Sequence, residues 1–86
     1  MNQHIDPKTF GLHPATKIER SGTKNFFILI DRKSRIIMKD GEKILDKVKK
    51  IKDIVPDAQV GLKTSAPVCS KTLDFLKKNG VAVTSL

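Results

Sequence analysis

The pattern of apolar and polar positions predicts a chain that alternates strands with helices. Residues 26–30 have the sequence FFILI, and five consecutive apolar residues are typical of a strand that is buried on both faces. A polar turn at 31–34 and a shorter apolar run at 36–38 follow, so the segment 25–40 predicts a β-hairpin. Alternation at 16–20, ahead of a Ser-Gly-Thr turn, predicts a short edge strand.

Helical spacing first appears after Asp40. This residue suits the N-cap of a helix over 41–55, because its carboxylate can accept hydrogen bonds from free backbone amides, and Pro56 ends the helix. The expected buried positions of this helix are Ile44, Leu45, Val48, Ile51 and Val55.

The remaining residues predict a strand at 58–62, a second helix at 66–78 and a last strand at 81–83. Ser65 is the expected N-cap of the second helix, and Gly80 is the expected left-handed residue beyond its end. The element order is therefore β-β-β-α-β-α-β, in an α/β protein bordering on α+β. We expect a small mixed sheet, in which an N-terminal antiparallel hairpin is followed by two right-handed crossover units.

Length and composition limit the architecture further. The 86 residues suffice for one domain with a modest core, which we assign to 15–86, and residues 1–14 predict an irregular N-terminal arm. The single Cys69 cannot form an internal disulfide, and no Cys/His spacing typical of a metal site is present. No apolar run is long enough to span a membrane, so we expect a cytoplasmic protein with no membrane partner and no cofactor.

Charge is the main functional signal of the sequence. The net charge is +8, from 17 basic and 9 acidic residues, and it favours an anionic partner such as nucleic acid. The alternative is that the excess of lysine reflects composition alone. Since the chain has no Trp or Tyr, base stacking is a poor prospect and phosphate contacts are expected instead. The predicted nucleic-acid-binding residues, at the hairpin tip and on the first helix, are Arg32, Lys33, Arg35, Lys43, Lys47 and Lys50.

A second hypothesis is a binder of a phosphorylated small molecule, or an enzyme that acts on one, at two strand-to-helix loops that meet, 39–41 and 63–67. The C-terminal ends of parallel strands share one edge of a sheet, where helix N-termini carry partial positive charge. The predicted anion-binding residues at this edge are Lys39, Lys63, Thr64 and Ser65. The competing interpretation is that the hydroxyl groups only cap helices. A third hypothesis is a structural or regulatory subunit that forms homo-oligomers through an exposed strand edge.

Catalysis receives less support, and we expect a binding protein rather than an enzyme. Cys69 lies near a predicted helix N-terminus, which lowers thiol pKa values, but no histidine can be paired with it. A hairpin followed by an α/β unit is also similar to the core of restriction nucleases, which requires an acid two residues before a lysine. Gly61 precedes Lys63 at that spacing and Ile37 precedes Lys39, so we reject the comparison at both lysines.

Overall fold

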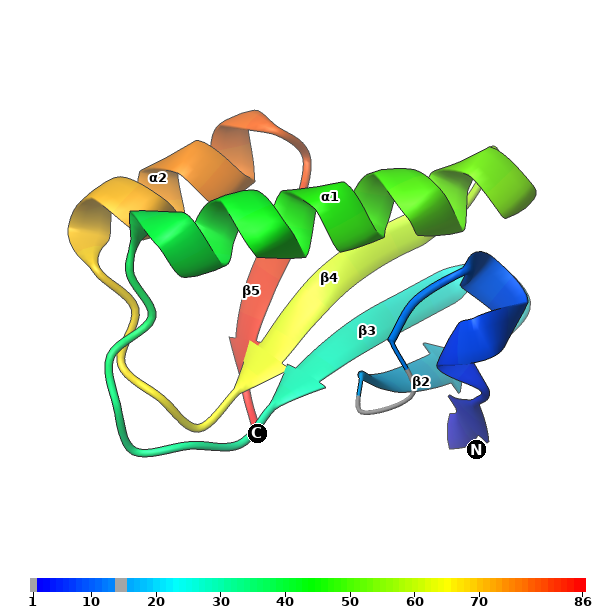
Figure 1. Cartoon of the computed structure of the whole chain (residues 1–86), viewed down its shortest axis with the longest axis horizontal. Coiled ribbons are helices and arrows are strands. Elements are labelled where there is room, and N and C mark those ends of the chain that lie inside the picture. Colours follow the sequence, from blue (N-terminus) through cyan, green and yellow to red (C-terminus); the bar gives the residue numbers. More distant parts are fainter. Residues whose placement is uncertain (1, 14–15) are drawn as a thin grey trace.

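The computed structural model describes residues 2–13 and 16–86, which form a five-stranded sheet with two helices over one face (Figure 1). The elements in chain order are β1 (Asn2–Ile5), the 3₁₀ turn η1 (Pro7–Phe10), β2 (Lys17–Ser21), β3 (Asn25–Ile30), α1 (Met38–Ile54), β4 (Gln59–Thr64), α2 (Ser70–Lys78) and β5 (Ala82–Ser85). The strands β1 to β3 pair antiparallel, whereas β3 to β5 pair parallel. The predicted α/β class, mixed sheet and element order are confirmed.

Buried and less buried side chains alternate along β3 and β4, so the sheet has one face covered by the helices and one uncovered face. Phe26 and Ile28 in β3, and Val60 and Leu62 in β4, are buried beneath the helices. Burial contributes about 1.5–3 kcal/mol for each such side chain. The intervening side chains of β3 are only partly buried, because no helix in the described part of the chain covers the other face. The prediction that this strand is buried on both faces was therefore wrong for the second face.

The segment 36–38 is not a strand, so the predicted hairpin over 25–40 is wrong. β3 instead forms a hairpin with β2, across a turn in which Gly22 has a positive φ of 76°. Ile36 makes a single parallel bridge to Val68, and α1 begins at Met38. Isoleucine is compatible with a strand or with the entry to a helix, so only this distant contact decides its conformation.

The remaining strand of the sheet, β1, comes from the part of the chain that was predicted to be irregular. Asn2–Ile5 pairs with β2, and η1 follows directly, so the irregular-arm prediction is wrong across these two elements. Phe10 packs edge-on against Phe26, with ring centroids 5.6 Å apart, which places η1 in the same layer as the helices. Met1 and Pro14, which the predicted arm also included, lie outside the described residues.

α2 also begins later than predicted, at Ser70 with Cys69 as its N-cap, so Ser65 does not cap this helix. The bridge between Ile36 and Val68 holds the residues before the helix extended. Gly80 has a positive φ of 76°, as expected of a left-handed residue beyond a helix. In the described part of the chain, neither helix is long and apolar enough to cross a membrane.

The sheet has two outer edges, formed by β1 and β5. Such edges carry backbone donors and acceptors that have no partner strand within the sheet. Association of two copies through one of these edges stays a prediction, which measurement of molecular mass in solution tests.

Candidate functional site

Four lysines form a ridge along one face of α1. Lys39, Lys43 and Lys47 are spaced four residues apart, and Lys50 follows three residues later, so all four lie on one helix face. The ridge borders a surface groove with a volume of about 490 Å³, which we call the α1 groove. The residues that complete the lining of the groove are Leu12, His13, Glu42 and Asp46.

The α1 groove carries an excess of positive charge. Its four lysines and two acids leave a net charge of +2, with His13 counted as neutral. Lys50 Nζ lies 3.5 Å from Asp46 Oδ2, an exposed pair of a kind that contributes about 0.3–0.5 kcal/mol. Among the described residues, no ion pair engages Lys39, Lys43 or Lys47. These three ammonium groups are therefore available to an external anion.

Lys47 connects the α1 groove to a neighbouring hollow of about 310 Å³. The hollow is also lined by Lys17, Asp31 and Arg32. Lys17 stands at the start of β2 and its side chain is exposed. The ridge of α1 and Lys17 therefore form one continuous basic surface, which extends to the start of β2.

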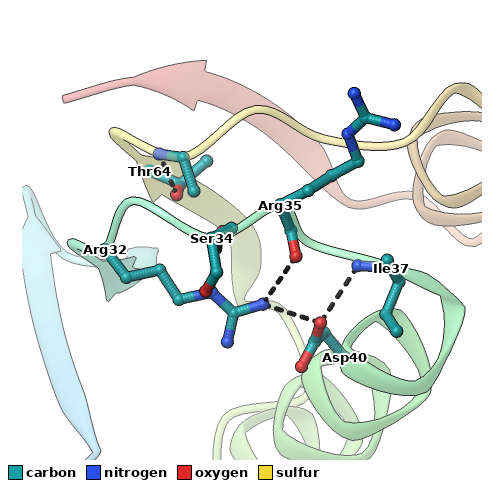
Figure 2. A network of polar contacts seen from close by, with 7 residues as sticks. Arg32, Ser34, Arg35, Ile37, Asp40 and Thr64 are labelled. Carbon is teal, nitrogen blue, oxygen red and sulfur yellow. Dashed lines mark hydrogen bonds and ion pairs between the residues drawn. The ribbon is translucent and has the colours of Figure 1, made fainter.

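Arg32 is held within its own loop (Figure 2). Its guanidinium donates to Asp40 Oδ2 at 2.7 Å and to the carbonyl oxygens of Ser34 and Arg35 at 3.2 and 3.1 Å. Asp40 Oδ2 also accepts from the backbone amide of Ile37 at 3.0 Å. Arg32 is thus occupied in bracing the entry to α1, although sequence analysis predicted it as a nucleic-acid contact.

Asp40 has a different role from the predicted N-cap. The helix begins two residues before it, so Asp40 occupies the first turn and reaches back to the amide of the capping residue, Ile37. That amide, followed by the Arg32 guanidinium, holds the pKa of Asp40 below its ordinary value. Asp40 is therefore an anchor that joins the β3–α1 loop to the helix.

The other cations of the predicted hairpin tip face elsewhere. Figure 2 shows the Arg35 guanidinium directed away from Asp40. Arg35 lines a separate groove of about 490 Å³ together with Cys69 and Lys71, and Lys33 is exposed in the loop. The predicted set of six nucleic-acid residues is therefore divided, with Lys43, Lys47 and Lys50 on the ridge and the other three in the loop.

The loop between β3 and α1 meets the loop between β4 and α2, but residues 39–41, which were expected to form the first of these loops, lie inside α1. The amide of Ile36 donates to the carbonyl of Pro67 at 2.8 Å, and the amide of Cys69 donates to the carbonyl of Ile36 at 2.9 Å. The hydroxyl groups are used inside this junction: Thr64 Oγ1 accepts from the amide of Ala66 at 3.0 Å, and Ser65 Oγ donates to an oxygen of Asp31. Local bracing accounts for both hydroxyls.

Lys63 points away from this junction. It lies between buried Leu62 and buried Thr64 in β4, so its side chain emerges on the uncovered face of the sheet. There its Nζ lies 2.9 Å from Glu19 Oε1, across β3, and 4.4 Å from the ring centroid of Phe27. Lys39 lies on α1 over the opposite face. The structure therefore does not bring Lys39 and Lys63 into one crevice.

Cys69 faces the first amides of α2. The backbone amides of Lys71 and Thr72 lower the pKa of its thiol below the ordinary value, and the Thr72 hydroxyl and the Arg35 charge add to the effect. No described histidine lines the groove beside Cys69. The geometry favours an ionisable thiol but supplies no general base.

The acid-to-lysine spacing that is missing at Lys63 and Lys39 occurs at Asp6 with Lys8 and at Asp31 with Lys33. Of these acids, only Asp31 follows the central strand of the sheet. Asp31 lies just beyond β3, and its Oδ1 accepts from Ser65 Oγ at 2.6 Å. Within the described residues, no three His, Cys, Asp or Glu side chains gather closely enough to hold a metal ion. The spacing alone therefore assigns no chemistry to this pair.

Sequence analysis also missed three residues that line the basic surface, Lys39, His13 and Lys17. Lys39 was predicted to bind a small anion at the strand-to-helix loops, because the helix was expected to start after this residue. The helix starts at Met38, which aligns Lys39 with Lys43 and Lys47. His13 and Lys17 come close to α1 only through the fold, and the sequence carries no local signal for that proximity.

Comparison with known proteins supports the fold. No protein-family model matches the chain, and no curated protein sequence matches it either. The structure is similar to a chain of the EndoMS–dsDNA2 complex, with a TM-score of 0.75 and 15% sequence identity. The similarity covers 99% of this chain and 36% of that chain, so this chain spans about a third of its structural neighbour. The chain therefore shares its fold with part of a protein whose structure was solved in complex with DNA.

Proposed function

We propose that this domain binds nucleic acid through contacts between the lysine ridge of α1 and backbone phosphates. The observation that carries the proposal is the α1 groove, where Lys39, Lys43 and Lys47 stand in one row and form no ion pair among the described residues. Lysine is a strongly hydrated point charge on a flexible stem, which suits phosphate contact better than base reading.

The acids of the groove weaken the attraction without cancelling it. Asp46 is already neutralised in part by Lys50, so Glu42 is the main repulsive group. The structural neighbour supports the proposal in a general way, since that protein was solved with DNA. The hypothesis of a small phosphorylated ligand loses its geometric basis, because Lys39 and Lys63 lie on different faces of the sheet.

The salt dependence of binding gives a quantitative expectation. Each phosphate contact adds about 0.9 to the slope of log affinity against log salt for duplex DNA. Each contact is therefore worth roughly eightfold in affinity at about 0.1 M salt. Removing two contacts lowers the affinity roughly 60-fold and reduces the slope by about 2.

The test compares two double variants that remove equal charge. Lys43→Ala/Lys47→Ala removes the centre of the ridge, whereas Lys71→Ala/Lys77→Ala removes two exposed lysines of α2. Fluorescence anisotropy with labelled duplex DNA, measured over a salt series, should show the large loss and the smaller slope only for the ridge variant. Equal losses in both variants would mean that total charge governs binding. Absence of binding by the unmodified protein at low salt would refute the proposal.

A further inference from the structure

We infer that the α1 groove accepts double-stranded rather than single-stranded nucleic acid and that it senses backbone charge rather than base sequence. This inference rests on the proposed function and specifies its substrate. It follows from what the basic surface lacks, from its dimensions and from its continuity across the fold.

Among the described residues that line the basic surface, His13 is the only ring side chain, and no Trp, Tyr or Phe is present to form a stacking platform. Binding of single strands without sequence preference depends on aromatic platforms worth about 1–3 kcal/mol per base. The chain has no Trp or Tyr, and all four Phe residues are engaged elsewhere. Phe10 and Phe26 are buried against each other, Phe27 lies beneath Lys63 on the uncovered sheet face, and Phe75 packs against the core.

No planar side chain is positioned on the ridge to recognise a base edge. Arginine reads guanine through a two-pronged contact, which requires a free guanidinium. The Arg32 guanidinium is already bonded to Asp40 and to two carbonyl oxygens, and Arg35 lines a different groove. Arg20 is half-buried in β2 and does not line the α1 groove. The ridge itself presents only ammonium groups, which attract phosphates of any sequence.

The dimensions of the ridge match a duplex. Lys39 and Lys50 are eleven positions apart, which at about 1.5 Å per residue corresponds to roughly 16 Å along the helix axis. The major groove of DNA is about 12 Å wide. The two ends of the ridge can therefore reach phosphates on opposite strands when α1 lies across the groove. A single strand offers one row of phosphates and half the charge per unit length.

The basic surface also extends beyond one row of side chains. Lys47 lines both the α1 groove and the adjacent hollow, where Lys17 adds an exposed charge contributed by β2. Charges on two elements form a surface broader than the track that a single strand would follow. A broad surface without a Trp, Tyr or Phe platform favours the substrate with the higher charge density, which is the duplex.

The magnitude of the preference follows from the number of contacts. With all four ridge lysines counted as contacts, including the weakly paired Lys50, the exponents of about 0.9 per contact for a duplex and about 0.7 for a single strand differ by about 0.8 in total. At about 0.1 M salt this difference gives a preference of about sixfold for the duplex.

The experiment measures anisotropy with one duplex DNA, with each of its two component strands and with a second duplex of unrelated sequence. We expect about sixfold tighter binding of the first duplex than of either strand and equal binding of the two duplexes. In Lys43→Ala/Lys47→Ala, where two contacts remain, the duplex preference should fall to about 2.5-fold. A single strand that binds as tightly as the duplex overturns this inference but leaves the proposed function intact. A difference between the duplexes of tenfold or more overturns the claim that sequence is not sensed. If no probe binds, the proposed function fails together with this inference.

Discussion

Removal of the Asp40 carboxylate should loosen the junction between the β3–α1 loop and the helix. Asp40 Oδ2 accepts from the amide of Ile37 and from the guanidinium of Arg32, at 3.0 and 2.7 Å. Asp40→Ala removes both interactions, and Asp40→Asn keeps one acceptor for the amide but loses the charge. Arg32 would still donate to the carbonyl oxygens of Ser34 and Arg35. We therefore expect partial loosening rather than loss of the fold.

The expected cost is moderate because the pair is only partly buried. The side chains of Asp40 and Arg32 are 25% and 35% exposed, so solvent screening reduces their ion pair to about 0.5–1 kcal/mol. The contact with the Ile37 amide resembles a helix cap, for which loss costs about 1 kcal/mol. Asp40→Ala should thus lower the free energy of unfolding by about 1.5–2 kcal/mol. For a domain of this size the melting temperature should fall by roughly 10 °C.

The loss of stability caused by Asp40→Ala should also depend on pH. The Ile37 amide and the Arg32 guanidinium lower the pKa of Asp40 in the folded state, whereas the unfolded chain has the ordinary value of about 3.9. The stabilisation is therefore complete above the unfolded pKa and is lost as pH falls through the lower, folded pKa. The stability difference between the unmodified protein and Asp40→Ala should narrow at acid pH.

Urea denaturation followed by circular dichroism, at neutral and at acid pH, measures both effects. Asp53→Ala is the matched control, because it removes an exposed acid from the same helix where no ion pair is formed by the described residues. The control should change stability by less than about 0.5 kcal/mol. If Asp40→Ala is as stable as the control at neutral pH, or if its deficit persists undiminished at acid pH, the anchor role of Asp40 is refuted.

Two further predictions concern packing and thiol ionisation. Gly41→Ala would place a Cβ 2.8 Å from Cγ2 of buried Thr72. Overpacking should lower the free energy of unfolding by about 1–3 kcal/mol and outweigh a gain in helix propensity of about 1 kcal/mol. Greater resistance of this variant to urea would contradict the prediction. The rate of Cys69 alkylation by iodoacetamide should rise with pH around an inflection below that of an ordinary thiol, and Arg35→Ala should move the inflection upward. An inflection at or above the ordinary value would show that the α2 amides do not stabilise the thiolate.

Local patterns in the sequence determined most of the elements. The apolar run of β3, the alternation of β4 and the helical stripe of α1 each follow from which side chains must leave water, and this requirement acts within a few residues. The lysines Lys43, Lys47 and Lys50 were placed on one face for the same reason, since helix periodicity applies to polar positions as well. These features needed no knowledge of distant contacts.

The tertiary structure alone decided the features that depend on contacts between distant segments. Residues 36 and 37 stay extended ahead of α1, where Ile36 bridges to Val68, and residues 2–5 form a strand because β2 offers them an edge. The direction of a long cation depends on its partner: Arg32 turns to Asp40, and Lys63 reaches Glu19 across an intervening strand. The sequence therefore determined that a lysine ridge exists, whereas the fold decided which other cations join it, because a charged side chain is directed by the nearest acid in space.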